Sequence, residues 1–144
     1  MSQMSDYLEN KLVDHIFRSA SFTKPAQLWV GLLTSAPSDS SPGTEVTGGA
    51  YARIQRDPSD TNWNATQGGT SGVSSGTSGD TDNVAAITFP VPSASWGLVT
   101  HLAVFDASTA GNMLVYGTLT NSKNINNGDP SPSFAAGQLD VIFA

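Results

Sequence analysis

Few side chains of this chain could catalyse a reaction, and they form no recognisable catalytic motif. Its 144 residues include two histidines, His15 and His101, and no cysteine. Ser95, His101 and Asp106 could be combined on paper into a Ser–His–Asp triad. No strand-to-helix turn that would present a nucleophilic serine is predicted, and no oxyanion loop is identifiable. We therefore expect both histidines to have structural roles and the chain not to be an enzyme, with a small hydrolase that uses His101 as the alternative.

Acidic and glycine-rich segments do not predict a metal or cofactor site. Asp80-Thr81-Asp82-Asn83 places oxygen ligands at alternating positions, like the start of a calcium loop, but it lacks the following glycine and the distal glutamate. The glycines between residues 68 and 79 fit neither a phosphate loop nor a dinucleotide fingerprint. Most of the remaining acids stand in predicted loops, where solvation is expected. We therefore expect no metal ligands, no cofactor and no catalytic residue.

Composition excludes several classes of protein. Lys and Arg number 6 against 12 Asp and Glu, so the net charge is −6, and the clustered bases that bind nucleic acid are missing. No apolar run approaches the length of a membrane span, and the first residues do not resemble a secretory signal. Only 12% of residues are charged, about half the usual share. This low charge suits a protein whose surface is partly covered by neighbouring subunits.

Hydrophobic periodicity predicts one helix followed by strands. Residues 5–18 carry apolar side chains every three to four positions, with Ser5 as N-cap, and therefore predict a helix. Beyond residue 25 the period changes to two, which is typical of strands. The predicted strands are 27–33, 51–55, 84–89, 98–105, 113–119 and 138–143, separated by turn-rich segments. We predict a mainly β protein, an antiparallel β-sandwich or jelly-roll preceded by one N-terminal α-helix.

The segment 66–83 is a Gly/Ser-rich stretch of low complexity. It cannot bury enough apolar area to offset the entropy lost on ordering, so it predicts an exposed flexible loop. Neither flank is long enough to be a separate domain. Residues 1–144 are therefore expected to form a single domain.

Candidate interface residues are arginines and aromatic side chains. Arg53 and Arg56 could pair with carboxylates of a partner subunit. Tyr51, Trp63 and Trp96 are candidate aromatic anchors for a protein interface, and exposed tryptophans could alternatively stack on a sugar.

The order of these motifs resembles a family of small tailed-bacteriophage virion proteins. Members are often described as tail fibre proteins, and they are similar to capsid cement or decoration proteins. The likeness covers nearly the whole chain outside the Gly/Ser-rich stretch. It rests on residues 8–18, 28–37, 45–46, 49–53, 87–90, 96–97, 100–101, 117–119 and 134–137.

The resemblance implies a structural role in the virion. A fibre needs length, repeats or heptads, and the chain has none of these, so we expect a capsid cement protein. Its expected partners are the major capsid protein and copies of itself, as a homodimer or trimer. The expected location is the capsid surface, after synthesis in the host cytoplasm. The alternative is a tail or tail-fibre module that binds a receptor.

Overall fold

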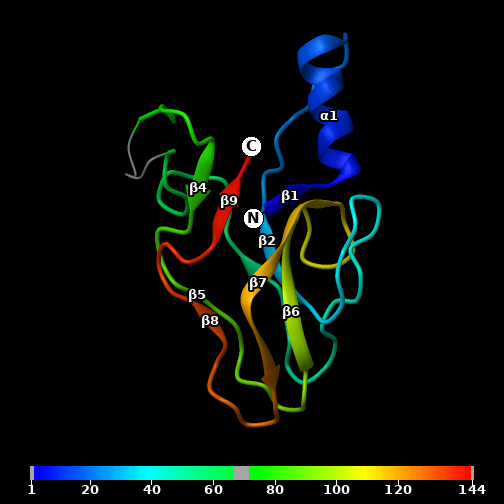
Figure 1. The fold of residues 1–144 in the computed structure, drawn as a ribbon, viewed down its shortest axis with the longest axis vertical. Helices are drawn as coiled ribbons and strands as arrows, with labels where there is room; N and C mark the ends of the chain where they lie inside the picture. The colour runs from blue at the N-terminus through cyan, green and yellow to red at the C-terminus, as the bar shows by residue number, and fades with distance from the viewer. Residues whose placement is uncertain (1, 67–71, 144) are drawn as a thin grey trace.

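The largest element of the protein is a five-stranded antiparallel sheet (Figure 1). The computed structural model describes residues 2–66 and 72–143. In the sheet the strands follow the order β1-β7-β6-β2-β3, and every neighbouring pair is antiparallel. Their bounds are β1 (Ser2–Met4), β2 (Trp29–Leu33), β3 (Ile54–Gln55), β6 (Gly97–Phe105) and β7 (Met113–Ile125). The predicted mainly β, antiparallel class with one N-terminal helix is confirmed.

Helix α1 (Asp6–Phe17) begins and ends where its sequence predicts. Ser5 is the N-cap, because its hydroxyl accepts a hydrogen bond from the Leu8 backbone N–H at 3.3 Å. Asp6 and Glu9 lie in the first turn, where the helix dipole favours negative charge. Arg18 is the C-cap, with extended backbone angles that end the helix. Met4, which precedes the N-cap, lies in β1.

Ser5 joins the helix to the sheet, and its replacement tests that connection. The side chain is buried, and its hydroxyl also donates a hydrogen bond to the carbonyl of Met113 in β7. We expect Ser5→Ala to lower the free energy of unfolding by about 1–2 kcal/mol, because both bonds are lost. Thermal unfolding followed by circular dichroism measures this. Ser19→Ala, an exposed serine beyond the helix, is the control, and an equal effect of both changes would contradict the capping role.

The β6–β7 hairpin is the centre of the sheet. Its connection, residues 106–112, is the turn-rich segment between two predicted strands. Asp106 accepts hydrogen bonds there from the backbone and side-chain nitrogens of Asn112, both at 2.7 Å. Strand β7 continues to Ile125, well beyond its predicted end at residue 119. All of the additional residues except the buried Ile125 are polar and exposed, so they lack the apolar alternation that reveals a strand. The last three of them pair with the first residues of β6.

Two short ribbons lie beside the sheet (Figure 1). Strand β4 (Asp80–Asp82) pairs with β9 (Asp140–Ile142), and β5 (Ile87–Thr88) pairs with β8 (Ser133–Phe134). The loop predicted at 66–83 therefore ends earlier than expected. Residues 80–82 are strand, and the next residue, Asn83, is fully buried. Residues 67–71 of that segment lie outside the described part of the chain.

The hydrophobic core lies between the sheet and the two ribbons. Its buried members come from both, such as Val30 and Val104 of the sheet, Ile87 of β5 and Val141 of β9. The division into one five-stranded sheet and two ribbons does not confirm the two four-stranded sheets of a jelly-roll. Among the residues that the structure describes, no helix is long and apolar enough to span a membrane.

Candidate functional site

The side chain of Arg53, which was predicted to bind a partner subunit, forms hydrogen bonds with residues of its own chain. Its guanidinium forms two hydrogen bonds with the Glu45 carboxylate, at 2.8 and 2.7 Å. Its remaining terminal nitrogen donates to the carbonyls of Ala107 and Ala110 in the β6–β7 loop. The guanidinium carbon also lies 3.4 Å from the centre of the Phe105 ring. The side chain is only 6% exposed, so Arg53 connects internal elements, and its contact with a partner subunit stays a prediction.

Tyr51 and Trp96 belong to the same internal framework. The Tyr51 hydroxyl donates to Glu45 and accepts from the backbone N–H of Leu32, both at 2.8 Å. Its ring packs edge-to-face against Trp96, whose indole N–H donates to the carbonyl of Gly49. Burial raises the pKa of Tyr51 far above its usual range, which keeps the hydroxyl protonated and able to donate. Gly31 is needed here, since an added Cβ would stand 3.0 Å from the Glu45 carboxylate.

Trp63 and Arg56 are half-buried and lie close together. The indole N–H of Trp63 donates to the Arg56 backbone carbonyl at 3.1 Å, and the Arg56 guanidinium donates to the carbonyls of Gln55 and Ala86. These bonds fix the loop that follows β3. Of the five predicted interface residues, Trp63 is the one that lines a large cleft, and its contact with another molecule remains a prediction.

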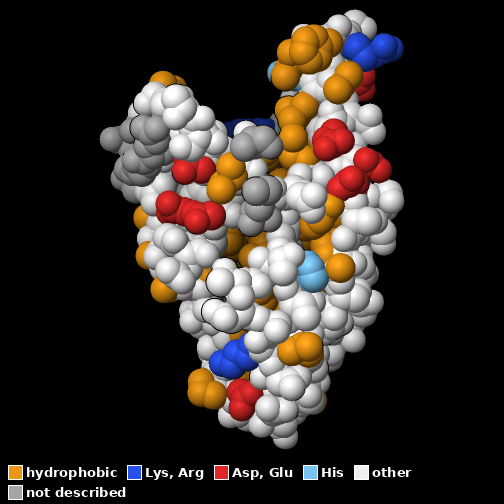
Figure 2. All heavy atoms as spheres, viewed as in Figure 1, with side chains coloured by type: hydrophobic (Ala, Val, Ile, Leu, Met, Phe, Trp, Pro, Cys, Tyr) orange, Lys and Arg blue, Asp and Glu red, His pale blue; other side chains and the backbone are white. Residues whose placement is uncertain are grey.

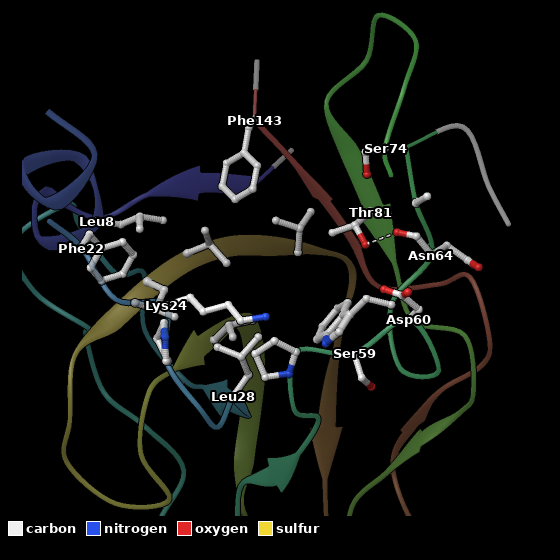
Figure 3. A pocket seen from close by; sticks show the side chains of 18 of the residues that line it. Leu8, Phe22, Lys24, Leu28, Ser59, Asp60, Asn64, Ser74, Thr81 and Phe143 are labelled. Carbon is white, nitrogen blue, oxygen red and sulfur yellow. Dashed lines mark hydrogen bonds between the residues drawn. The ribbon is translucent and has the colours of Figure 1, made fainter. Parts of the chain in front are cut away.

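This cleft opens between helix α1 and the β4–β9 ribbon (Figure 3). Its volume is about 430 Å³, and Val104 and Leu114 of the sheet are among the residues that line it. Lys24 extends its ammonium group into the cleft, while Asp60 stands at the edge (Figure 3). The apolar walls come from Leu8, Phe22, Leu28, Trp63, Val141 and Phe143.

The outer half of helix α1 carries an uncovered apolar surface. We call Val13, Ile16 and Phe17 the helix patch; their exposed fractions are 48%, 63% and 80%. The sequence pattern predicted an apolar stripe along the whole helix, but only Leu8 at its base is buried. The reason is that the helix projects past the end of the sheet (Figure 1). Figure 2 shows hydrophobic side chains along the helix and around the hollow beside it.

Residues of the hydrolase alternative have separate partners. Ser95 donates to the Ile125 carbonyl, His101 bonds to Thr100, and Asp106 holds Asn112. The nine-residue strand β6 separates Ser95 from Asp106, so the three do not form a triad. The spacing Gly-x-Ser-x-Gly occurs at residues 72–76. The structure places that segment in an exposed loop without helix or strand.

His15 and the acidic segment also have local roles. His15 accepts a hydrogen bond from the backbone N–H of Phe22, which turns the chain back along the helix. Asp82 accepts a hydrogen bond from the Asn64 side chain, and Asn83 uses its amide for internal bonds. Within residues 2–66 and 72–143, no cluster of three or more His, Asp or Glu side chains could hold a metal ion.

Tyr116 of β7 provides a pH-dependent contact. Its hydroxyl donates to the carboxylate of Asp39, and chiefly this bond raises the pKa of Tyr116 to about 12. An unfolded tyrosine loses its proton near pH 10, so the folded state retains a proton that the unfolded state has lost between about pH 10 and pH 12. Stability contributed by this contact is therefore complete below pH 10 and disappears as the pH rises to 12.

Between pH 10 and pH 12, we expect the free energy of unfolding of Tyr116→Phe to fall less steeply with pH than that of the original chain. The variant is also less stable than the original chain at neutral pH, because the hydrogen bond is absent. Urea unfolding at a series of pH values measures both effects. Asp39→Asn should flatten the same window, since it removes the cause of the raised pKa. If the free energy of unfolding of both variants fell with pH as steeply as that of the original chain, the role assigned to the Tyr116–Asp39 contact would be contradicted.

A model of a phage protein family matches the chain over residues 3–142, nearly its whole length. The family is described as podophage GP4 fiber I protein gp80. The chain belongs to this family. No curated protein matches the chain significantly. The expected membership of a small tailed-phage virion protein family, often described as tail fibre proteins, is confirmed.

Proposed function

We propose that the chain is a structural subunit of the fibre apparatus of a podophage virion. The observation that carries this proposal is the combination of the helix patch and the adjoining cleft, an apolar surface that a free protein would leave in water. Burial of such a surface against other virion proteins stabilises an assembly by binding alone. The family description, which names a fibre protein, supports the fibre as the location.

In this role the chain acts without catalysis, cofactor or metal. The buried side chains of Arg53 and Asn83 form hydrogen bonds within the chain, which is the behaviour of structural residues. The alternative of a receptor-binding module that stacks a host glycan on exposed tryptophans has less support. Trp96 is buried and Trp63 is half-buried in the cleft wall, so neither presents a free ring face comparable to the exposed Phe17.

A capsid cement protein is the second candidate, because the chain is a small β protein without fibrous repeats. Its five-stranded sheet and two ribbons share one core, and the helix patch would then bind the major capsid protein. Such a protein would strengthen the head by joining neighbouring capsid subunits.

Electron microscopy of virions assembled with and without the protein tests both candidates. A fibre subunit should appear as density on the tail; particles that lack it should bind fewer host cells but have heads of unchanged heat resistance. Density on the head, together with heads that open at lower temperature when the protein is missing, would contradict the fibre role and support cement.

A further inference from the structure

Lys24 brings a positive charge into the cleft between α1 and the β4–β9 ribbon (Figure 3). Its ammonium group extends among side chains that are mostly apolar. It forms no hydrogen bond or ion pair with residues 2–66 or 72–143. Asp60, the acid at the edge of the cleft, is exposed to water and leaves this cation unpaired. A cation that stands beside apolar walls without a counter-ion favours the binding of an anion.

The walls around the ammonium group are suited to hydrocarbon. Phe22, Leu28 and Val141 contribute apolar side chains, and Val104 and Leu114 of the sheet also line the cleft. Its volume of about 430 Å³ is within the range of sites that enclose small organic ligands. An alkyl chain that entered the cleft would be removed from water together with these side chains. The cleft therefore fits a molecule that joins an apolar body to an anionic group.

The polar side chains of the walls already form hydrogen bonds within the chain. The Thr81 hydroxyl donates to the Asn64 backbone carbonyl at 2.6 Å, and the Asn64 side chain donates to Asp82. The Ser59 hydroxyl is hydrogen-bonded to Thr61. A peptide segment in the cleft would bury its backbone N–H and C=O groups against walls that offer them few partners, which costs free energy. An alkyl chain has no such groups, so it fits these walls better than a protein segment does.

We propose that the cleft binds a free fatty acid, with the carboxylate on the Lys24 ammonium group and the alkyl chain along the apolar walls. The ion pair fixes which end of the ligand faces Lys24, and burial of the chain supplies most of the affinity. The inference goes beyond the proposed function. A ligand enclosed in the cleft leaves the helix patch exposed, so the patch can still contact another virion protein.

Isothermal titration calorimetry of the full chain with decanoate tests the inference. We expect one decanoate to bind per chain, and we expect Lys24→Met to raise its dissociation constant by about tenfold or more, because the ion pair is lost. Lys24 is exposed, so the variant should fold. Lys123→Met, which removes an exposed lysine of β7 outside this cleft, should leave the constant unchanged. Uncharged decan-1-ol should bind the original chain and Lys24→Met equally well.

Reversal of the charge gives a sharper test than its removal. We expect Lys24→Glu to bind decyltrimethylammonium more tightly than decanoate, the opposite of the original chain. Phe17→Asp, in the helix patch, should leave decanoate binding unchanged, since Phe17 does not line the cleft. A chain that does not bind decanoate, or binds it equally well after Lys24→Glu, would overturn the inference. An equal loss of binding in Phe17→Asp would also overturn it, because the ligand would then lie on the helix patch.

Trp63 reports where the alkyl chain lies. It lines the cleft, whereas Trp29 and Trp96 do not. Bromine quenches a tryptophan that it contacts, so ω-bromodecanoate should quench the fluorescence of the original chain, and Trp63→Phe should remove most of this quenching. Quenching that is unchanged in Trp63→Phe would contradict binding in the cleft. Binding of the chain to phosphatidylglycerol vesicles without binding of free decanoate would likewise contradict it and indicate a membrane surface as the ligand.

Discussion

Replacement of Arg53 by methionine is expected to lower the free energy of unfolding by about 3 kcal/mol. Methionine retains most of the apolar stem but loses the guanidinium. Glu45 then keeps a poorly exposed carboxylate without its cation, and the carbonyls of Ala107 and Ala110 lose their donor. Ala110 has the left-handed backbone angle φ 51°, so Arg53 also holds a strained loop in place. Urea unfolding followed by tryptophan fluorescence measures the loss.

The pair Arg18–Asp14 provides the matched control for Arg53. It is also an arginine–carboxylate pair, with a separation of 3.1 Å, but its side chains are 70% and 40% exposed. We expect Arg18→Met to change stability by less than about 0.5 kcal/mol, because water screens an exposed pair. The double change Glu45→Gln with Arg53→Met should recover part of the loss, since the uncompensated charge is removed. Equal effects of Arg53→Met and Arg18→Met would contradict this account.

Asn83→Ala is expected to have an effect of similar size, about 3 kcal/mol or more, because buried backbone groups lose their partners. The Asn83 side chain makes four hydrogen bonds. Its amide donates to the carbonyls of Ala85 and Ala135, and its oxygen accepts from the backbone N–H groups of Gln138 and Leu139. These bonds lie between the β4–β9 and β5–β8 ribbons, where strand pairing is interrupted. Asn83 thus replaces the missing part of the ladder.

Two further variants test the role of Asn83. Asn83→Asp can still accept two hydrogen bonds but cannot donate to the two carbonyls, so it should remain clearly destabilised. Asn127→Ala, at an exposed position in a turn, should change stability by less than about 0.5 kcal/mol. Hydrogen exchange of the Leu139 amide reports the local effect directly. Protection of that amide in Asn83→Ala equal to that in the original chain would contradict the assignment.

The local elements of this fold could be predicted because their signals are local. Ser5 and the following apolar period define α1 to within a residue, and turn-forming residues between two apolar runs define the β6–β7 hairpin. The exposed end of β7 and the short strands β4 and β8 were missed. They contain mostly polar residues, and their pairing with distant segments, rather than their own composition, makes them strands.

Family membership and the mainly β class with one helix were thus contained in the sequence itself. Tertiary structure alone decided which polar residues are buried and which apolar residues are not. The sequence alone does not show that Glu45 and two loop carbonyls surround Arg53, because burial of a charge depends on partners brought together by long-range folding. The apolar period of α1 shows that one side of the helix favours burial. The position of the helix decides whether the chain's own sheet covers Phe17. In this structure the sheet does not reach Phe17, which stays exposed.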